Sequence, residues 1–281
     1  MGPSATTTVE AAGTVDRSSR NTAVLVVFTA VTNLADGVTK VALPLLATAL
    51  TSSPAQISGV ALTLTLPWLL VALHVGVLVD RADRRRLLWL ANGLRMAVMV
   101  ALLAAVATDG TNLPMLYAGG LTLGVAEVIA LTSAAALVPD AVAEPGRERA
   151  NAWVAGAETV CNEFLGPFVG GLLVVAGAAV ALGATTVAYL AGIATLLFLV
   201  GRFRVVRATD RPRESVHQQI VEGLRFLWRQ RVLRLMSLVL TVLCSCWGAW
   251  LALMPLFATT RMGLDARGYG MLVSALGVGG L

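Results

Sequence analysis

The chain has 281 residues, of which 57% are hydrophobic and 13% are charged. Soluble domains carry about 25% charged residues, so this composition excludes an ordinary soluble domain and indicates a membrane protein. The formal net charge of +5 comes from arginines that gather in a few loops without interleaved aromatic residues, which gives no indication of nucleic-acid binding.

Residues 1–21 are rich in Thr, Ser, Ala and Gly, and we expect them to form a disordered cytoplasmic tail. Six apolar segments follow, each near the length of about 20 residues that a helix needs to cross a bilayer. They cover residues 23–49, 57–79, 87–107, 113–139, 152–177 and 180–201. We expect a six-helix transmembrane bundle over residues 22–201.

Residues 202–234 are basic and too polar to insert, so they are expected to form a cytoplasmic linker. Within it, apolar residues recur at helical intervals: Val216, Ile220, Leu224, Leu227 and Trp228. This pattern predicts an amphipathic helix along the cytoplasmic face, with its apolar side on the bundle or on lipid headgroups. A solvated connector is the alternative.

A seventh span is expected over residues 235–259, and an eighth begins near Gly268 but is too short to cross. Shifting the chain by 211 residues repeats part of the first span in the seventh. Pro44, Leu45, Ala47, Thr48, Ala55 and Gly59 then fall on Pro255, Leu256, Ala258, Thr259, Ala266 and Gly270. We therefore expect residues 235–281 to start a second bundle that is incomplete, either as a copy of a longer protein or through an early stop.

The orientation follows from the basic residues in the loops. With a cytoplasmic N-terminus, 17 of the 21 Lys and Arg residues fall on the cytoplasmic side. Only Arg261 and Arg267 fall on the opposite side, while Lys40 and Arg95 lie within spans. The positive-inside rule therefore predicts a cytoplasmic N-terminus.

The turn after the second span reads Gly-Val-Leu-Val-Asp-Arg-Ala-Asp-Arg-Arg-Arg over residues 76–86. It resembles the signature loop between the second and third helices of the major facilitator superfamily. The matching positions are Gly76, Asp80, Arg81, Arg84 and Arg85. Asp83 departs from the pattern, which prefers Gly there.

The fifth span contains Gly166, Pro167, Gly170 and Gly171. They resemble the Gly-Pro-x-x-Gly-Gly antiporter motif of proton-driven exporters, although Ala157 stands where that motif has an upstream glycine. The resemblance runs from about residue 23 to the end and points to the branch of drug and siderophore exporters, which includes enterobactin and macrolide exporters. A packing kink explains the same residues equally well.

Residues of the signature loop are implied by the resemblance to latch the two halves when the cavity faces outward. We expect Gly76 to admit a neighbouring helix closely and Asp80 to cap a helix or pair with an arginine. Asp140, at the end of the fourth span, is a candidate partner for Arg84 or Arg85. The alternative is that the arginines serve only as a positive-inside anchor.

Ionisable residues inside spans are the functional candidates, because charge in hydrocarbon is costly. Thr29, Asn33, Asp36 and Lys40 form one polar stripe on the first span, which lines the central cavity in the fold that the resemblance implies. Asp36 is the leading candidate for proton coupling. A static ion pair between Asp36 and Lys40, one turn apart, is the alternative.

Glu127, Glu158 and Glu163 are further candidates for proton coupling. An ideal helix would rotate Glu163 away from Glu158, toward the packing side. Both residues could also snorkel to the interface. Arg95, in the third span, could pair with any of these acids.

These features predict an all-α polytopic protein with the major facilitator fold: a complete first bundle, about seven full transmembrane helices and a truncated eighth. We expect a proton-coupled exporter of lipophilic small molecules, monomeric and in a bacterial cell membrane. An importer of a small metabolite and a truncated, non-transporting protein are the alternatives. The sequence lacks His-Glu-x-x-His and a phosphate-binding glycine loop, so we expect no enzyme, metal or cofactor.

Overall fold

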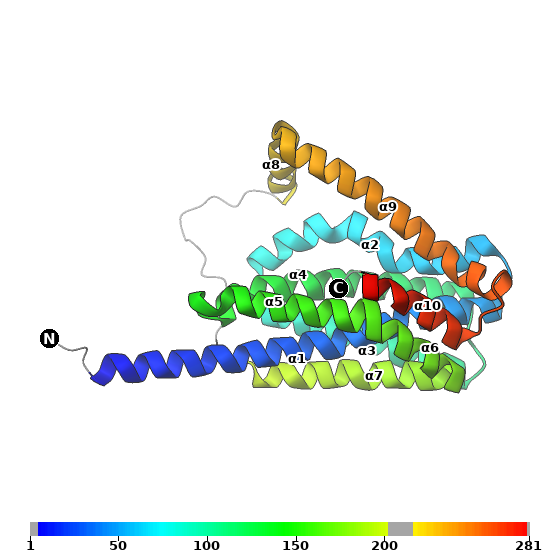
Figure 1. Cartoon of the computed structure of the whole chain (residues 1–281), viewed down its shortest axis with the longest axis horizontal. Helices are drawn as coiled ribbons and strands as arrows, with labels where there is room; N and C mark the ends of the chain where they lie inside the picture. Colours follow the sequence, from blue (N-terminus) through cyan, green and yellow to red (C-terminus); the bar gives the residue numbers. More distant parts are fainter. Residues whose placement is uncertain (1–4, 202–215, 280–281) are drawn as a thin grey trace.

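The computed structural model describes residues 5–201 and 216–279, and these residues form helices without any strand (Figure 1). The helices are α1 (Ala5–Leu50), α2 (Pro54–Arg81), α3 (Arg84–Ala107), α4 (Leu113–Ala141), α5 (Arg147–Glu158), α6 (Gly166–Ala176), α7 (Ala178–Thr195), α8 (Val216–Arg229), α9 (Arg231–Thr260) and α10 (Ala266–Gly279). Two short 3₁₀ helices, η1 (Glu144–Gly146) and η3 (Leu196–Phe198), and a π-helix, η2 (Thr159–Leu165), join them.

Seven helical stretches in the described part of the chain are long and apolar enough to cross a membrane. The fifth, Glu144–Ala176, combines η1, α5, η2 and α6 into one span. The prediction of an all-α protein with seven full spans is therefore confirmed.

Helices α1 to α7 run side by side as a bundle (Figure 1). Helix α4 packs against α2 and α3, while α7 packs against α1 and α3. One buried cluster, including Leu88 and Leu137, fills the end of the bundle that carries the basic loops. A second, separate cluster, including Leu43 and Met99, fills the other half of the bundle.

Two glycines allow α4 to approach α2 closely. A Cβ atom on Gly124 would lie 2.6 Å from the carbonyl oxygen of Leu64 and 2.8 Å from Pro67. A Cβ on Gly120 would collide with the side chain of Thr63. These glycines are four residues apart, a spacing that brings small residues onto one face of a membrane helix. The contact fixes α4, which carries Glu127, against α2.

The N-terminal tail differs from the expectation of disorder, because α1 already begins at Ala5. Helix propagation adds one hydrogen bond for each residue fixed, so a well-anchored helix can extend beyond its packed part. The anchor is Asn21, which is 3% exposed. Its Nδ2 donates to the carbonyl oxygens of Ala141 and Val200, each at 2.9 Å, and its Oδ1 accepts from Val200 N at 3.1 Å.

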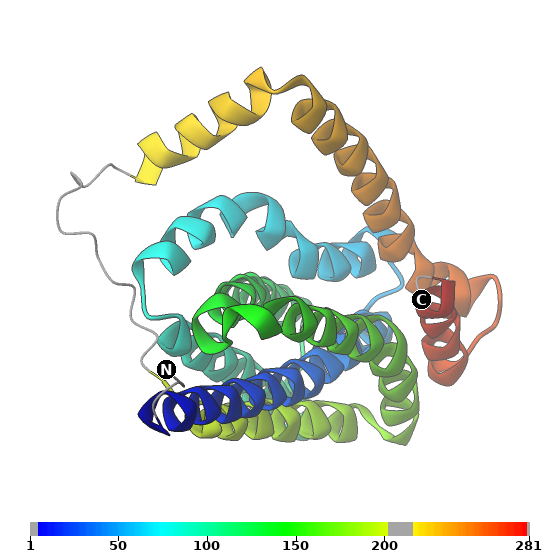
Figure 2. The same ribbon diagram turned by 60° about the vertical axis from the view of Figure 1, so that its left-hand side comes forward.

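The amphipathic helix expected between the bundles corresponds to α8, and the preceding residues 202–215 lie outside the described part of the chain. Helix α9 diverges from the bundle along its first part (Figure 2). Helix α10 returns to pack against α6, with the side chain of Tyr269 2% exposed. Both α9 and α10 thus approach the bundle at the end opposite to the basic loops.

Candidate functional site

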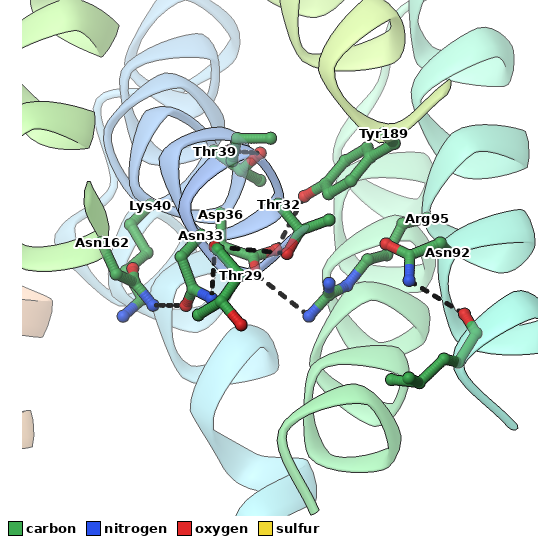
Figure 3. A network of polar contacts seen from close by, with 12 residues as sticks. Thr29, Thr32, Asn33, Asp36, Thr39, Lys40, Asn92, Arg95, Asn162 and Tyr189 are labelled. Atoms are coloured by element: carbon green, nitrogen blue, oxygen red, sulfur yellow. Dashed lines mark hydrogen bonds and ion pairs between the residues drawn. The ribbon is translucent and has the colours of Figure 1, made fainter. Parts of the chain in front are cut away.

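An acid, a base and a phenol from three helices meet in the interior of the bundle (Figure 3). Asp36 Oδ2 on α1 lies 3.0 Å from Arg95 Nη2 on α3. The hydroxyl of Tyr189 on α7 donates to Asp36 Oδ1 at 2.7 Å. The Arg95 guanidinium also lies 5.5 Å from the centre of the Tyr189 ring, which suits a cation–π contact. Asp36 therefore pairs with Arg95 and not with Lys40, the alternative partner considered from the sequence.

This cluster is almost completely shielded from solvent. Asp36 is 7% exposed, Arg95 1% and Tyr189 0%. Among the described residues, Arg95 Nε and Nη2 make no hydrogen bond of normal geometry, so Asp36 holds the guanidinium mainly by charge. Because a buried, incompletely bonded charge is expensive, such a group is more typical of a functional site than of a stabilising contact.

The polar stripe of α1 lies on one face, as predicted, and its members contact different helices. Asn33 Nδ2 donates to Thr29 O at 2.9 Å, and Asn162 Nδ2 donates to Asn33 Oδ1 at 3.0 Å. Asn33 and Asn162 are each 3% exposed. The stripe therefore joins α1 to the π-helix η2, next to the Asp36 cluster.

Lys40 pairs with Glu163, with 3.1 Å between Nζ and Oε1. Glu163 was expected near the packing side, and the structure corrects this: its side chain is 49% exposed. The cause is η2, in which Glu163 lies. A π-helix has more residues per turn than an α-helix, so it rotates Glu163 back toward the face of Glu158.

A cavity of about 200 Å³ lies between α1, α3, α4 and α5, beside the acid–base cluster. Arg95 and Asn33 contribute to its inner wall, and Glu158 and Asn151 come from α5. Apolar side chains make up most of the remaining lining: Phe28, Ala130, Leu131, Ala134, Ala135, Val154 and Ala155. Arg95 thus pairs with Asp36 and also lines the cavity, and Glu158 lines the same cavity.

Glu127 on α4 is also buried, at 9% exposure. Of the four predicted intramembrane acids, the structure pairs Asp36 with Arg95 and Glu163 with Lys40, and it places Glu158 in the cavity wall.

The glycines of the fifth span make two close helix contacts. A Cβ on Gly166 would lie 2.6 Å from the Cα of Gly37 on α1, and one on Gly170 would lie 3.0 Å from the Cα of Val38. On another side, a Cβ on Gly270 of α10 would lie 2.6 Å from Pro167 O and 2.9 Å from the Cα of Gly171. The four motif residues are all buried. These glycines thus admit neighbouring helices closely, and the irregular segment η2 ends directly before Gly166.

The charged loop after α2 has one of its predicted pairs. Arg84 Nη1 forms an ion pair with Asp140 and also donates to Ala136 O at 2.9 Å. Arg85 Nη2 donates to Leu196 O at 3.0 Å. These contacts tie the start of α3 to the ends of α4 and α7, and Arg81 lies at the C-terminal end of α2.

Two expectations for this loop need correction. The cap of α3 is Asp83, whose Oδ1 accepts from Arg86 N at 3.2 Å; Asp80, for which a cap or a pair with an arginine was expected, is exposed near the end of α2. A Cβ on Gly76 would meet nothing within 4 Å. Gly76 therefore has no close helix neighbour among the described residues.

Sequence reasoning missed Tyr189 and Gly37. Tyr189 is the only tyrosine of α7, and a hydroxyl inside an apolar span is a signal that could have identified it. Gly37 directly follows Asp36, but its importance depends on the partner glycine of another helix. The local signal for an irregular span was Pro167, which has no N–H to donate to Glu163 O, although it does not specify a π-helix.

Two comparisons with known proteins, with a family model and with individual relatives, point to the same family. Residues 25–281 match the family model of the major facilitator superfamily. The multidrug efflux pump Tap of Mycolicibacterium fortuitum is 29% identical over 274 residues, which cover 94% of this chain and 66% of that protein. The Tap pumps of Mycobacterium bovis (strain BCG / Pasteur 1173P2) and Mycobacterium tuberculosis (strain ATCC 25618 / H37Rv) are each 31% identical over 236 residues, covering 79% of this chain and 54% of theirs. The chain thus spans between about half and two thirds of the length of these relatives.

Proposed function

The chain belongs to the major facilitator superfamily, and from that premise we propose that it is a secondary active transporter that exports lipophilic small molecules. The relatives described as multidrug efflux pumps support export over import. In this proposal transport proceeds by alternating access and is driven by protons, with Asp36 as the coupling carboxylate.

The observation that carries the proposal is the buried contact of Asp36 with Arg95 and Tyr189. Protonation would neutralise Asp36 and leave the Arg95 guanidinium buried without its counter-charge. Breaking a buried ion pair on one side costs about 3–5 kcal/mol. A proton therefore favours a different arrangement of α1 and α3, which is the requirement for coupling proton entry to a conformational change.

The adjacent cavity supports a lipophilic cargo, because its lining is mostly apolar with a few polar groups. Its volume of about 200 Å³ is below the range of about 300–1,000 Å³ that is typical of drug-sized ligands. It would therefore hold part of such a molecule, with Asn151 and Glu158 available to polar or cationic groups.

The remaining roles follow from the same proposal. The protein would act as a monomer in a bacterial cell membrane with a cytoplasmic N-terminus, as the basic loops favour. The Arg84–Asp140 pair and the loop residues Gly76, Asp80, Arg81 and Arg85 would take part in the latch between halves. The Gly166 motif would provide the hinge next to Asp36.

The test is efflux of a fluorescent lipophilic dye from cells that produce the 281-residue chain, with and without a protonophore. We expect efflux that stops when the proton gradient collapses and that falls by about 100-fold or more in Asp36→Asn, since a positioned proton-transfer group typically contributes about 10²- to 10⁴-fold to a rate. Asp109→Asn is the matched control, since Asp109 is exposed in a loop with φ of 53°, a conformation that Asn also adopts. Gradient-driven efflux that is unchanged in Asp36→Asn would exclude Asp36 as the coupling group, and absence of efflux from the unmodified chain would refute the proposed function.

A further inference from the structure

Helix α8 lies across the direction of the bundle helices. In Figure 1 it is seen nearly end-on while α1 to α7 run lengthwise, and Figure 2 shows it in side view. It lies at the end of the bundle where the chain begins and where the basic loop after α2 is found. For spans that cross a bilayer, this orientation places α8 along the membrane surface.

The surface of α8 combines exposed apolar and basic side chains. Leu224 is 47% exposed and Trp228 is 63% exposed, whereas Ile220, Val221 and Leu227 of the same apolar face are half-buried. Arg225 and Arg229 are exposed on the flank of that face. An aromatic and an aliphatic side chain flanked by arginines suits the level where acyl chains meet phosphate groups.

The junction with α9 holds this surface in place. Gln230 is extended and separates the two helices. Arg234 Nη1 on α9 donates to Trp228 O at 3.3 Å, and its guanidinium lies 5.7 Å from the centre of the Trp228 ring. Arg231, in the first turn of α9, is exposed beside this junction. The basic groups of both helices are therefore displayed together.

We propose that α8 and the first turn of α9 bind anionic phospholipid of the leaflet at this end of the bundle. The arginines Arg225, Arg229 and Arg231 contact the phosphate groups, while Leu224 and Trp228 insert at the headgroup boundary. The surface of α8 is mainly basic, since Glu222 is its only acidic residue. An anionic leaflet attracts basic segments next to a membrane helix. Lipid binding by α8 does not depend on the transport activity.

The test is native mass spectrometry of the purified full chain in detergent, with dioleoylphosphatidylglycerol and dioleoylphosphatidylcholine as competing lipids. We expect preferential retention of the phosphatidylglycerol. Arg225→Gln/Arg229→Gln should weaken that preference about ten-fold, because each basic residue near an anionic surface contributes roughly five-fold before screening. Arg225→Lys/Arg229→Lys keeps the charges and should keep most of the preference.

The matched control is Arg261→Gln/Arg267→Gln, which removes the same charge from exposed positions at the other end of the bundle. It should retain the preference. An unchanged preference in the Arg225/Arg229 variant, or an equal loss in the control, would overturn the proposal. Hydrogen exchange of α8 in nanodiscs gives a second readout: slower exchange with phosphatidylglycerol than with phosphatidylcholine alone is expected, and equal rates would count against lipid contact.

Discussion

Replacing Arg95 by methionine tests whether the buried acid and base are a coupled unit. Arg95 is 1% exposed and Asp36 7%, so Arg95→Met would leave a buried carboxylate with only the Tyr189 hydroxyl as a described polar partner. Removing one member of a buried pair costs about 3–5 kcal/mol. The double variant Asp36→Asn/Arg95→Met leaves no unpaired buried charge, so its destabilisation should be about 2–3 kcal/mol smaller than the sum of the two single effects.

The measurement is a double-mutant cycle from equilibrium unfolding of the purified chain in mixed detergent micelles. The two single variants and the double variant should give an interaction free energy of about 2–3 kcal/mol. Arg84→Met serves as the comparison, since its pair with Asp140 is partly exposed, at 17% and 38%, and should contribute at most about 1 kcal/mol. If the single effects of the buried pair add to within about 0.5 kcal/mol, the two residues are not coupled and the proposed response to protonation loses its basis.

Three further changes test the packing and hydrogen bonds around the cluster. Gly37→Val should lower the free energy of unfolding by about 2–4 kcal/mol, because a Cβ at Gly37 would lie 2.5 Å from Asn162 O. A Cβ at Gly183 would meet nothing within 4 Å, so Gly183→Ala should raise the free energy of unfolding by up to about 1 kcal/mol. Unfolding in micelles measures both variants, and equal effects would contradict the close contact between Gly37 and Asn162. Asn21→Ala removes three hydrogen bonds and should cost about 2–3 kcal/mol in the same assay, with a loss below about 0.5 kcal/mol arguing against the anchor. Tyr189→Phe removes the hydroxyl that holds Asp36 Oδ1 and should lower dye efflux several-fold while the amount of protein in the membrane stays the same; full efflux would show that this hydrogen bond does not matter for transport.

The spans and the charged loop were predictable because both depend on local sequence. Uninterrupted apolar stretches predict membrane helices without any knowledge of their neighbours, and seven such stretches are found in the described residues. The pairing of Arg84 with Asp140 was also accessible, since two charged residues at adjacent ends of spans on the same side have few other partners. The polar stripe from Thr29 to Lys40 required only the helical period.

Partners across the bundle could not be chosen from the sequence. Asp36 had Lys40 one turn away, and its contact with Arg95 is set by how α1, α3 and α7 pack. Glu163 was assigned to the wrong face because the ideal helical period fails in η2; Pro167 indicates an interruption of the helix there but not that it takes the form of a π-helix. For Gly76, the absence of a side chain predicted a close neighbour, but a small residue permits an approach without requiring one.

Helix α1 lies between two ion pairs of different character. The side chains of Lys40 and Glu163 are 29% and 49% exposed, so this pair is less completely enclosed by the protein than the pair of Asp36 and Arg95, whose side chains are 9% and 1% exposed. In the proposed cycle, neutralisation therefore has its large energetic effect at Asp36. Gly37, the next residue, is in backbone contact with Gly166, where no side chain can absorb a displacement. A shift of α1 that follows loss of the Asp36 charge would consequently pass directly to α6, and from Gly171 to Gly270 of α10.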